Sequence, residues 1–178
     1  MILGKSTLSC MICKEFSKMK KKTLIVDFDV YNKSISILYN TFSKKIDYEK
    51  IENNIIKVSK YEHLLFVEES FLQSKDIFNT IKKLKNEYEQ IIIDTSSNIK
   101  SQEYKRILEI SDDIIFIVIP SVCELKKSIK IFEILKEDYK IPLQKIRFVI
   151  NKQNSYSVDN LIIQKIFGAK KINRKYQI

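Results

Sequence analysis

Glycine is scarce in this chain: Gly4 and Gly168 are the only two among its 178 residues. The backbone therefore has few positions at which a tight turn comes without steric cost. Long apolar runs are also lacking, since none approaches the roughly 18 to 20 residues of a membrane-spanning helix. The first residues do not have the form of a secretory signal peptide. We expect a soluble, cytoplasmic protein.

Cysteine and histidine are similarly rare, with three cysteines and a single histidine. Three cysteines are too few for a disulfide framework and fit a reducing compartment. Cys10 and Cys13 form a C-x-x-C pair, but a zinc site would need two further ligands, and only Cys123 and His63 remain. We predict that Cys10 and Cys13 are buried core thiols and that His63 is structural rather than catalytic.

Positive charge is in excess, with 32 Lys and Arg against 22 Asp and Glu and a formal net charge of +10. Such a charge permits an acidic partner such as nucleic acid, a nucleotide or anionic lipid. The lysines are spread along the chain rather than blocked, which favours a solvated surface. The basic tail 169–178 is too short and too weakly apolar to anchor to a membrane. We favour a solvated end over a lipid or DNA contact for this tail.

Short apolar segments alternate with helical patterns along the chain. Strands are expected at 23–29, 64–67, 90–95, 114–119 and 146–150. Helices are expected at 6–19, 71–88, around 104–108, at 122–139 and at 158–167, with short helices and loops in 33–60. This alternation predicts βαβ units and an α/β fold of three layers with a mainly parallel sheet. At 178 residues, we expect one domain over 1–178.

The first expected helix, 6–19, is amphipathic. Its apolar residues at helical spacing are Leu8, Met11, Ile12, Phe16 and Met19, and we predict that this face is buried.

The stretch Gly4-Lys5-Ser6-Thr7 opens this helix and matches the second half of a phosphate-binding loop. Backbone N–H groups at a helix N-terminus bind phosphate oxygens, Lys5 would neutralise them, and the Ser6 hydroxyl would ligate Mg²⁺. The complete loop needs a further glycine and a preceding strand, where this chain has only Met1, Ile2 and Leu3. Four residues alone are a weak signal.

Carboxylates follow two of the expected strands: Asp27 and Asp29 after the first, and Asp94 after the third. In open α/β sheets, ligands bind at the carboxyl ends of the strands. Each residue taken singly has a plainer explanation, because serines often cap helices and aspartates often cap turns. Together with Lys5 and Ser6, however, they supply the groups that nucleoside triphosphate hydrolysis requires.

These segments resemble the MinD/ParA group of P-loop ATPases, and within it the CpaE-like branch associated with pilus and secretion systems. The segments that carry the resemblance appear in family order at 4–7, 22–29, 34–38, 88–95, 111–115 and 148–152. The resemblance implies an ATP-dependent homodimer that holds Mg²⁺ and ATP between its subunits and hydrolyses ATP slowly as a switch. Members of the group use the ATP state to bind a membrane, DNA or a partner protein, so some are peripheral to the membrane.

The resemblance also implies roles for individual residues. Phosphate contacts fall to Gly4, Lys5 and Thr7, magnesium binding to Ser6, Asp94 and Asp27, positioning of the attacking water to Asp29, and adenine recognition to Asn151. Lys5 and Asp29 are the expected catalytic residues.

Three departures from the family pattern leave alternatives open. The family's first strand and the start of its glycine-rich loop would lie before Met1. Thr95-Ser96-Ser97-Asn98 stands where the family usually has Pro and Gly, and the region after the last helix is short. One alternative is a degenerate or truncated, non-catalytic member that serves as a protein-interaction module. Another is a partition protein that binds DNA through its lysines, with a steep salt dependence.

Overall fold

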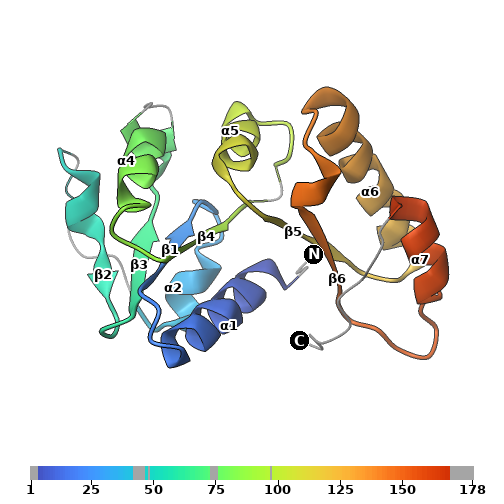
Figure 1. The fold of residues 1–178 in the computed structure, drawn as a ribbon, viewed down its shortest axis with the longest axis horizontal. Helices are drawn as coiled ribbons and strands as arrows, with labels where there is room; N and C mark the ends of the chain where they lie inside the picture. The colour runs from blue at the N-terminus through green and yellow to red at the C-terminus, as the bar shows by residue number, and fades with distance from the viewer. Residues whose placement is uncertain (1–3, 42–46, 48, 73–75, 97, 169–178) are drawn as a thin grey trace. The chain divides into compact units, whose positions relative to one another are not determined.

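The computed structural model describes residues 4–41, 47, 49–72, 76–96 and 98–168, so the basic tail lies outside the described residues. Residues 5–107 form one compact unit, and residues 1–4 with 108–178 form the other. The elements, most of which are labelled in Figure 1, are α1 (Lys5–Lys18), β1 (Thr23–Asp27), α2 (Ser34–Leu38), η1 (Ile51–Asn54), β2 (Ile56–Lys57), β3 (Glu62–Phe66), α3 (Glu69–Leu72), α4 (Asp76–Leu84), β4 (Gln90–Asp94), α5 (Gln102–Ile110), β5 (Ile114–Val118), α6 (Val122–Glu133), η2 (Ile134–Asp138), η3 (Leu143–Lys145), β6 (Ile146–Ile150) and α7 (Asn160–Phe167). This order confirms the α/β class.

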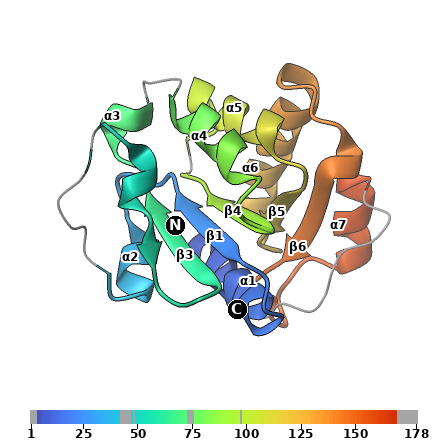
Figure 2. The ribbon, with the colours of Figure 1, turned by 60° about the vertical axis from the view of Figure 1, so that its left-hand side comes forward.

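The unit of residues 5–107 is built on a four-stranded sheet in the order β2-β3-β1-β4. β1 pairs in parallel with both β3 and β4, and the short β2 pairs antiparallel with β3. Every residue of β1 is buried, as its continuously apolar sequence predicts for a strand covered on both faces. Figures 1 and 2 show α1 and α2 on one face of this sheet and α4 on the other.

The buried face of α1 only partly matches the one its apolar spacing predicts, because Leu8 is buried and Ile12 and Phe16 are half-buried. Met11 and Met19 were expected in the core but are 39% and 62% exposed. Cys10 and Cys13 are buried, as predicted, and they pack with apolar residues of β1, α2 and β3.

Several element boundaries also differ from the expectation. The predicted helix 71–88 is replaced by α3 and α4, and the predicted strand 64–67 begins earlier, at Glu62, so that His63 lies within β3. The two-residue strand β2 was not predicted, because two residues carry no periodicity. The helix expected over 122–139 ends as an α-helix at Glu133 and continues as a π-helical turn.

The second unit contains the parallel pair β5 and β6, with α6 and α7. Its core is a cluster of four phenylalanine rings whose centroids lie 5.2 to 6.1 Å apart, namely Phe116, Phe132, Phe148 and Phe167. The rings come from β5, α6, β6 and α7, so this cluster ties all four elements together. Across the described ranges of both units, we find no helix of the length and apolarity needed to cross a membrane.

Candidate functional site

The hydroxyl of Ser6, in the first turn of α1, donates a 2.6 Å hydrogen bond to Oδ2 of Asp94, the last residue of β4. Ser9, one turn further along α1, donates to Oδ1 of the same carboxylate at 3.3 Å. Asp94 is only 2% exposed. Burial raises the pKa of its carboxyl, and the Ser6 hydrogen bond and the charge of Lys5 oppose that rise. The structure therefore joins Ser6 and Asp94, two of the three residues expected to hold magnesium.

Asp27 ends β1 directly beside Asp94, since the two are register partners in the parallel pairing of β1 and β4. It is 3% exposed, and burial raises the pKa of its carboxyl to about 7, with the charges of Asp94 and Asp29 adding to the rise. Its Oδ1 accepts a hydrogen bond from the backbone N–H of Asp29 at 2.9 Å. Within the described part of the chain, its Oδ2 has no hydrogen-bond partner. A buried carboxylate oxygen without a donor is costly unless a cation or a proton meets it.

Asp29 follows β1 and is 9% exposed. The side-chain amide of Asn32 donates to both of its carboxylate oxygens, at 3.0 and 2.8 Å. The charge of Asp29 contributes to the raised pKa of both Asp27 and Asp94. The three carboxylates that the sequence singles out thus act on one another at one edge of the sheet.

Gly4 and Asn151 belong to the other unit and lie against each other. Gly4 has a φ of +78°, and a Cβ added there would meet the Asn151 Nδ2 at 2.6 Å. Asn151 is 1% exposed, and its Oδ1 accepts a hydrogen bond from the backbone N–H of Lys152 at 2.8 Å. The role of Asn151 in adenine recognition and the phosphate roles of Gly4 and Thr7 stay predictions.

The sequence reasoning missed two residues that contact the site. Ser9 lies three positions after Ser6, so helical spacing places both hydroxyls on one edge of α1. Asn32 lies three positions after Asp29, a spacing at which a carboxylate can accept from the turn that follows it. Both could have been found by asking which polar side chains share a face or a turn with the expected ligands.

The donor set fits magnesium better than zinc. Among the residues that the structure describes, no group of three or more His, Cys, Asp or Glu side chains could hold a metal ion. Magnesium does not require such a group, because it is usually bound by one or two carboxylates, with water and phosphate oxygens completing its shell. Ser6 and Asp94 supply a hydroxyl and a carboxylate, and Oδ2 of Asp27 is a further oxygen that could contact a bound cation.

The sequence matches the family described as the CobQ/CobB/MinD/ParA nucleotide binding domain over residues 3–172. The chain belongs to this family. That match confirms the resemblance to the MinD/ParA group, whereas the assignment to its CpaE-like branch stays a prediction. A search of curated proteins finds no match.

Solved structures of this nucleotide-binding family share the fold. A ParA family ATPase from Chlorobium tepidum aligns with a TM-score of 0.77 and 19% identity, over 93% of this chain and 76% of that one. The MinC:MinD cell division protein complex of Aquifex aeolicus aligns with a TM-score of 0.75 and 19% identity, over 94% of this chain and 74% of that one. The septum site-determining protein MinD of Pyrococcus horikoshii, complexed with Mg-ADP, aligns with a TM-score of 0.73 and 19% identity, over 92% of this chain and 72% of that one. These similarities confirm the predicted P-loop NTPase fold.

Proposed function

We propose that this domain binds ATP with Mg²⁺ at the carboxyl edge of β1 and β4 and hydrolyses it slowly, as a switch that controls dimerisation and partner binding. The observation that carries the proposal is the Ser6–Asp94 hydrogen bond beside Oδ2 of Asp27, which has no hydrogen-bond partner among the residues that the structure describes. Two buried carboxyls with raised pKa values at a strand edge need a cation when they are ionised. The Mg-ADP complex of the MinD structure is consistent with this ligand.

In this proposal, each residue of the site has a separate role in phosphoryl transfer. Lys5 opens α1 and supplies positive charge to the phosphates, together with the backbone N–H groups of that helix start. Ser6 and Asp94 hold the metal, whose contribution in such sites is to neutralise phosphate charge. Asp29, fixed by Asn32, orients the attacking water. Asp27 accepts from the backbone at Asp29 and so links the metal side of the site to the water side.

Dimerisation and partner binding rest on the family alone. The MinC:MinD complex is a precedent for a second protein bound to a related domain. Sedimentation velocity of this chain with and without Mg·ATP tests the dimer, because an ATP-dependent homodimer roughly doubles the sedimenting mass. A single monomeric species under both conditions would contradict the switch.

Calorimetric titration with Mg·ATP tests the binding step. We expect saturable binding that weakens by roughly ten- to a hundred-fold in Lys5→Ala, because a charge-assisted phosphate contact contributes about 1.5–3 kcal/mol. The matched control is Lys18→Ala, which removes one lysine from the exposed end of the same helix. Equal weakening in both variants would indicate general electrostatics. No binding to a folded sample would leave the chain as a non-catalytic interaction module.

A further inference from the structure

A cavity with several lysines in its lining lies at the opposite end of the same sheet. A cavity of about 430 Å³ opens at the amino ends of β1, β3 and β4, whereas Asp27 and Asp94 stand at the carboxyl ends. Its wall comes from five segments: the residue before β1, the η1 turn, the β2–β3 hairpin, the end of α4 and the loop before β4. Its polar and charged lining residues are Lys22, Glu52, Lys57, Ser59, Lys60, His63, Glu87 and Tyr88.

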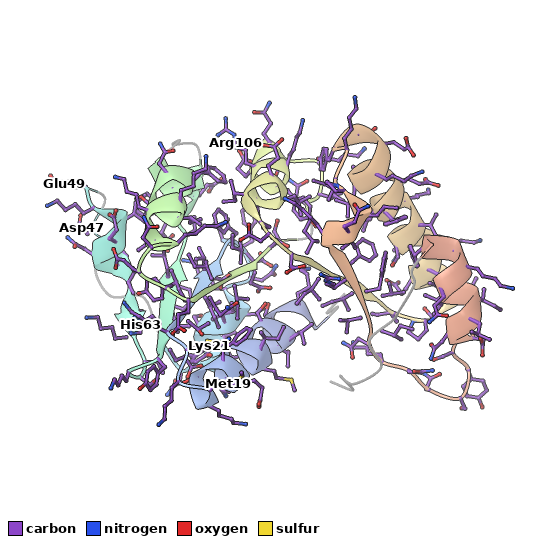
Figure 3. The ribbon with its side chains drawn as sticks, viewed as in Figure 1. Met19, Lys21, Asp47, Glu49, His63 and Arg106 are labelled. Atoms are coloured by element: carbon purple, nitrogen blue, oxygen red, sulfur yellow. The ribbon has the colours of Figure 1, made fainter. Side chains whose placement is uncertain are left out.

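The floor of this cavity is a buried polar pair. His63, labelled in Figure 3, is 4% exposed, and its Nδ1 lies 2.7 Å from the Tyr88 hydroxyl. The two rings meet edge to face, with centroids 5.4 Å apart. The imidazole also hydrogen-bonds the backbone of Ser59, so both of its ring nitrogens can be engaged. The pair is held rigidly and does not need a ligand in order to be satisfied.

Two lysines place positive charge around that floor. The Lys22 Nζ lies 4.4 Å from the centroid of the Tyr88 ring, and Lys57 is the register partner of His63 across β2 and β3. Burial lowers the pKa of His63, and the charges of Lys22 and Lys57 lower it further. The charges that act on the imidazole are thus positive.

The rim carries charges of both signs. Lys60, in the hairpin turn, is a third cation, and two exposed carboxylates, Glu52 and Glu87, line the same cavity. Three ammonium groups against two carboxylates leave the lining with one net positive charge, and the two lysines whose charges act on His63 are Lys22 and Lys57. A bound anion would bring together lysines from separate segments of the chain, which otherwise repel one another.

We propose that this cavity, lined by Lys22, Lys57, Lys60, His63 and Tyr88, binds a small multivalent anion through its phosphate or carboxylate groups. The site is separate from the proposed nucleotide site, because it contains none of the residues assigned to ATP. The Tyr88 ring holds Lys22 over the cavity, and the hairpin brings Lys57 and Lys60 to its rim. Occupancy would tie the edge strand β2 to the start of β1.

The chain's only histidine provides the probe. With ¹³C-labelled histidine, the single Cε1–H resonance of His63 is followed by NMR during titration with pyrophosphate and, separately, with citrate. We expect a saturable shift, and a higher pKa for His63 in the bound state, because the anion offsets the charges of Lys22 and Lys57. Comparing the two anions shows whether phosphate or carboxylate is preferred.

Two charge-matched double variants decide the location. The double variant Lys57→Ala with Lys60→Ala is expected to weaken binding of the anion at least tenfold. Lys126→Ala with Lys130→Ala removes the same charge from exposed positions on α6 and is expected to leave binding unchanged. Equal weakening in both pairs, or no saturable shift in the wild type, would overturn the proposal.

Lys5→Ala separates this site from the nucleotide site. The His63 response to pyrophosphate should survive in that variant, while ATP binding weakens by roughly ten- to a hundred-fold. A response abolished by Lys5→Ala would place the anion at the other edge of the sheet and refute the inference, whereas loss of ATP binding alone tests only the proposed function.

Discussion

The side-chain amide of Asn32 donates to both carboxylate oxygens of Asp29, at 2.8 and 3.0 Å. A second donor, the Asn32 backbone N–H, lies 3.3 Å from Oδ1. One residue thus fixes the plane of the carboxylate expected to position the attacking water. Neither residue belongs to a helix or strand, so this contact, and not a regular element, sets the orientation of Asp29.

Asn32→Ala is therefore expected to slow ATP hydrolysis by roughly ten- to a hundred-fold while ATP affinity stays within a factor of two or so, because only the water loses its orientation. Single-turnover hydrolysis and calorimetry on the same sample measure the two effects. Asn53→Ala, which removes an amide donor from the half-buried Asp47, is the matched control. Equal losses of affinity and rate would show that Asn32 supports the fold of the loop instead.

Asp27→Asn is expected to change how stability depends on pH. Burial raises the pKa of Asp27 to about 7 in the folded wild type, whereas in the unfolded chain the carboxyl loses its proton near its ordinary pKa of 3.8. The free energy of unfolding of the wild type should therefore fall, relative to the variant, as the pH rises from 4 to 7. The difference is expected to reach up to about 4 kcal/mol. Urea unfolding at several pH values measures it.

Asp47→Asn provides the contrasting control, because hydrogen bonds from Asn53 and two backbone N–H groups lower the pKa of Asp47. Its removal should reduce stability at neutral pH, the opposite sign from Asp27→Asn. A flat difference between wild type and Asp27→Asn across this range would show that Asp27 is ionised in the folded protein and already compensated.

Gly4→Ala is expected to destabilise the protein more than Gly168→Ala. Both glycines have a positive φ, +78° and +61°, so both substitutions introduce backbone strain of about 1–2 kcal/mol. Only at Gly4 would the new Cβ also meet a neighbour, the Asn151 Nδ2 at 2.6 Å, which adds about 1–3 kcal/mol of overpacking. Thermal and urea unfolding of the two variants give the difference.

Adding Asn151→Ala to Gly4→Ala should recover part of that loss by removing the clash. If the two glycine variants are equally stable, then the close approach of Gly4 to Asn151 is relaxed in solution.

Thiol labelling should distinguish the three cysteines. Cys123 is exposed, whereas Cys10 and Cys13 are buried, and burial raises the pKa of both thiols to about 12. Because the thiolate is the reactive form, Ellman's reagent should modify one thiol rapidly in the folded protein and three after unfolding. Cys123→Ser should abolish the rapid phase. Rapid labelling of a second thiol would contradict the buried C-x-x-C pair.

Sequence patterns predicted those parts of the fold that are built from short, continuously apolar segments. The run Leu24-Ile25-Val26 identified the fully buried β1, and the carboxylates Asp27 and Asp94 lie side by side at the carboxyl ends of β1 and β4. The prediction that Met19 is buried was wrong, because the spacing of apolar residues along a helix does not show which face of the helix packs against the sheet. Ser9 and Asn32 escaped notice because their contacts depend on tertiary geometry at the strand ends.

The hydrogen-bond partner of His63 could not be predicted from the sequence either. The sequence gives it no visible partner, and the structural role predicted for it does not by itself identify one. Its partner, Tyr88, lies 25 residues away, and the parallel pairing of β1 with β3 and β4 brings the two segments to the same end of the sheet. Such a contact follows from strand order, which a single sequence does not encode locally.

The two-residue strand β2 also bears on how much of the sheet edge is open to pairing with another chain. It occupies one end of the sheet order and runs antiparallel to β3, so it covers the edge that β3 would otherwise present. A strand this short, with an exposed Lys57, offers another chain little backbone to pair with and a charge that disfavours stacking. This edge of the sheet is thereby protected against the intermolecular strand addition from which aggregates grow.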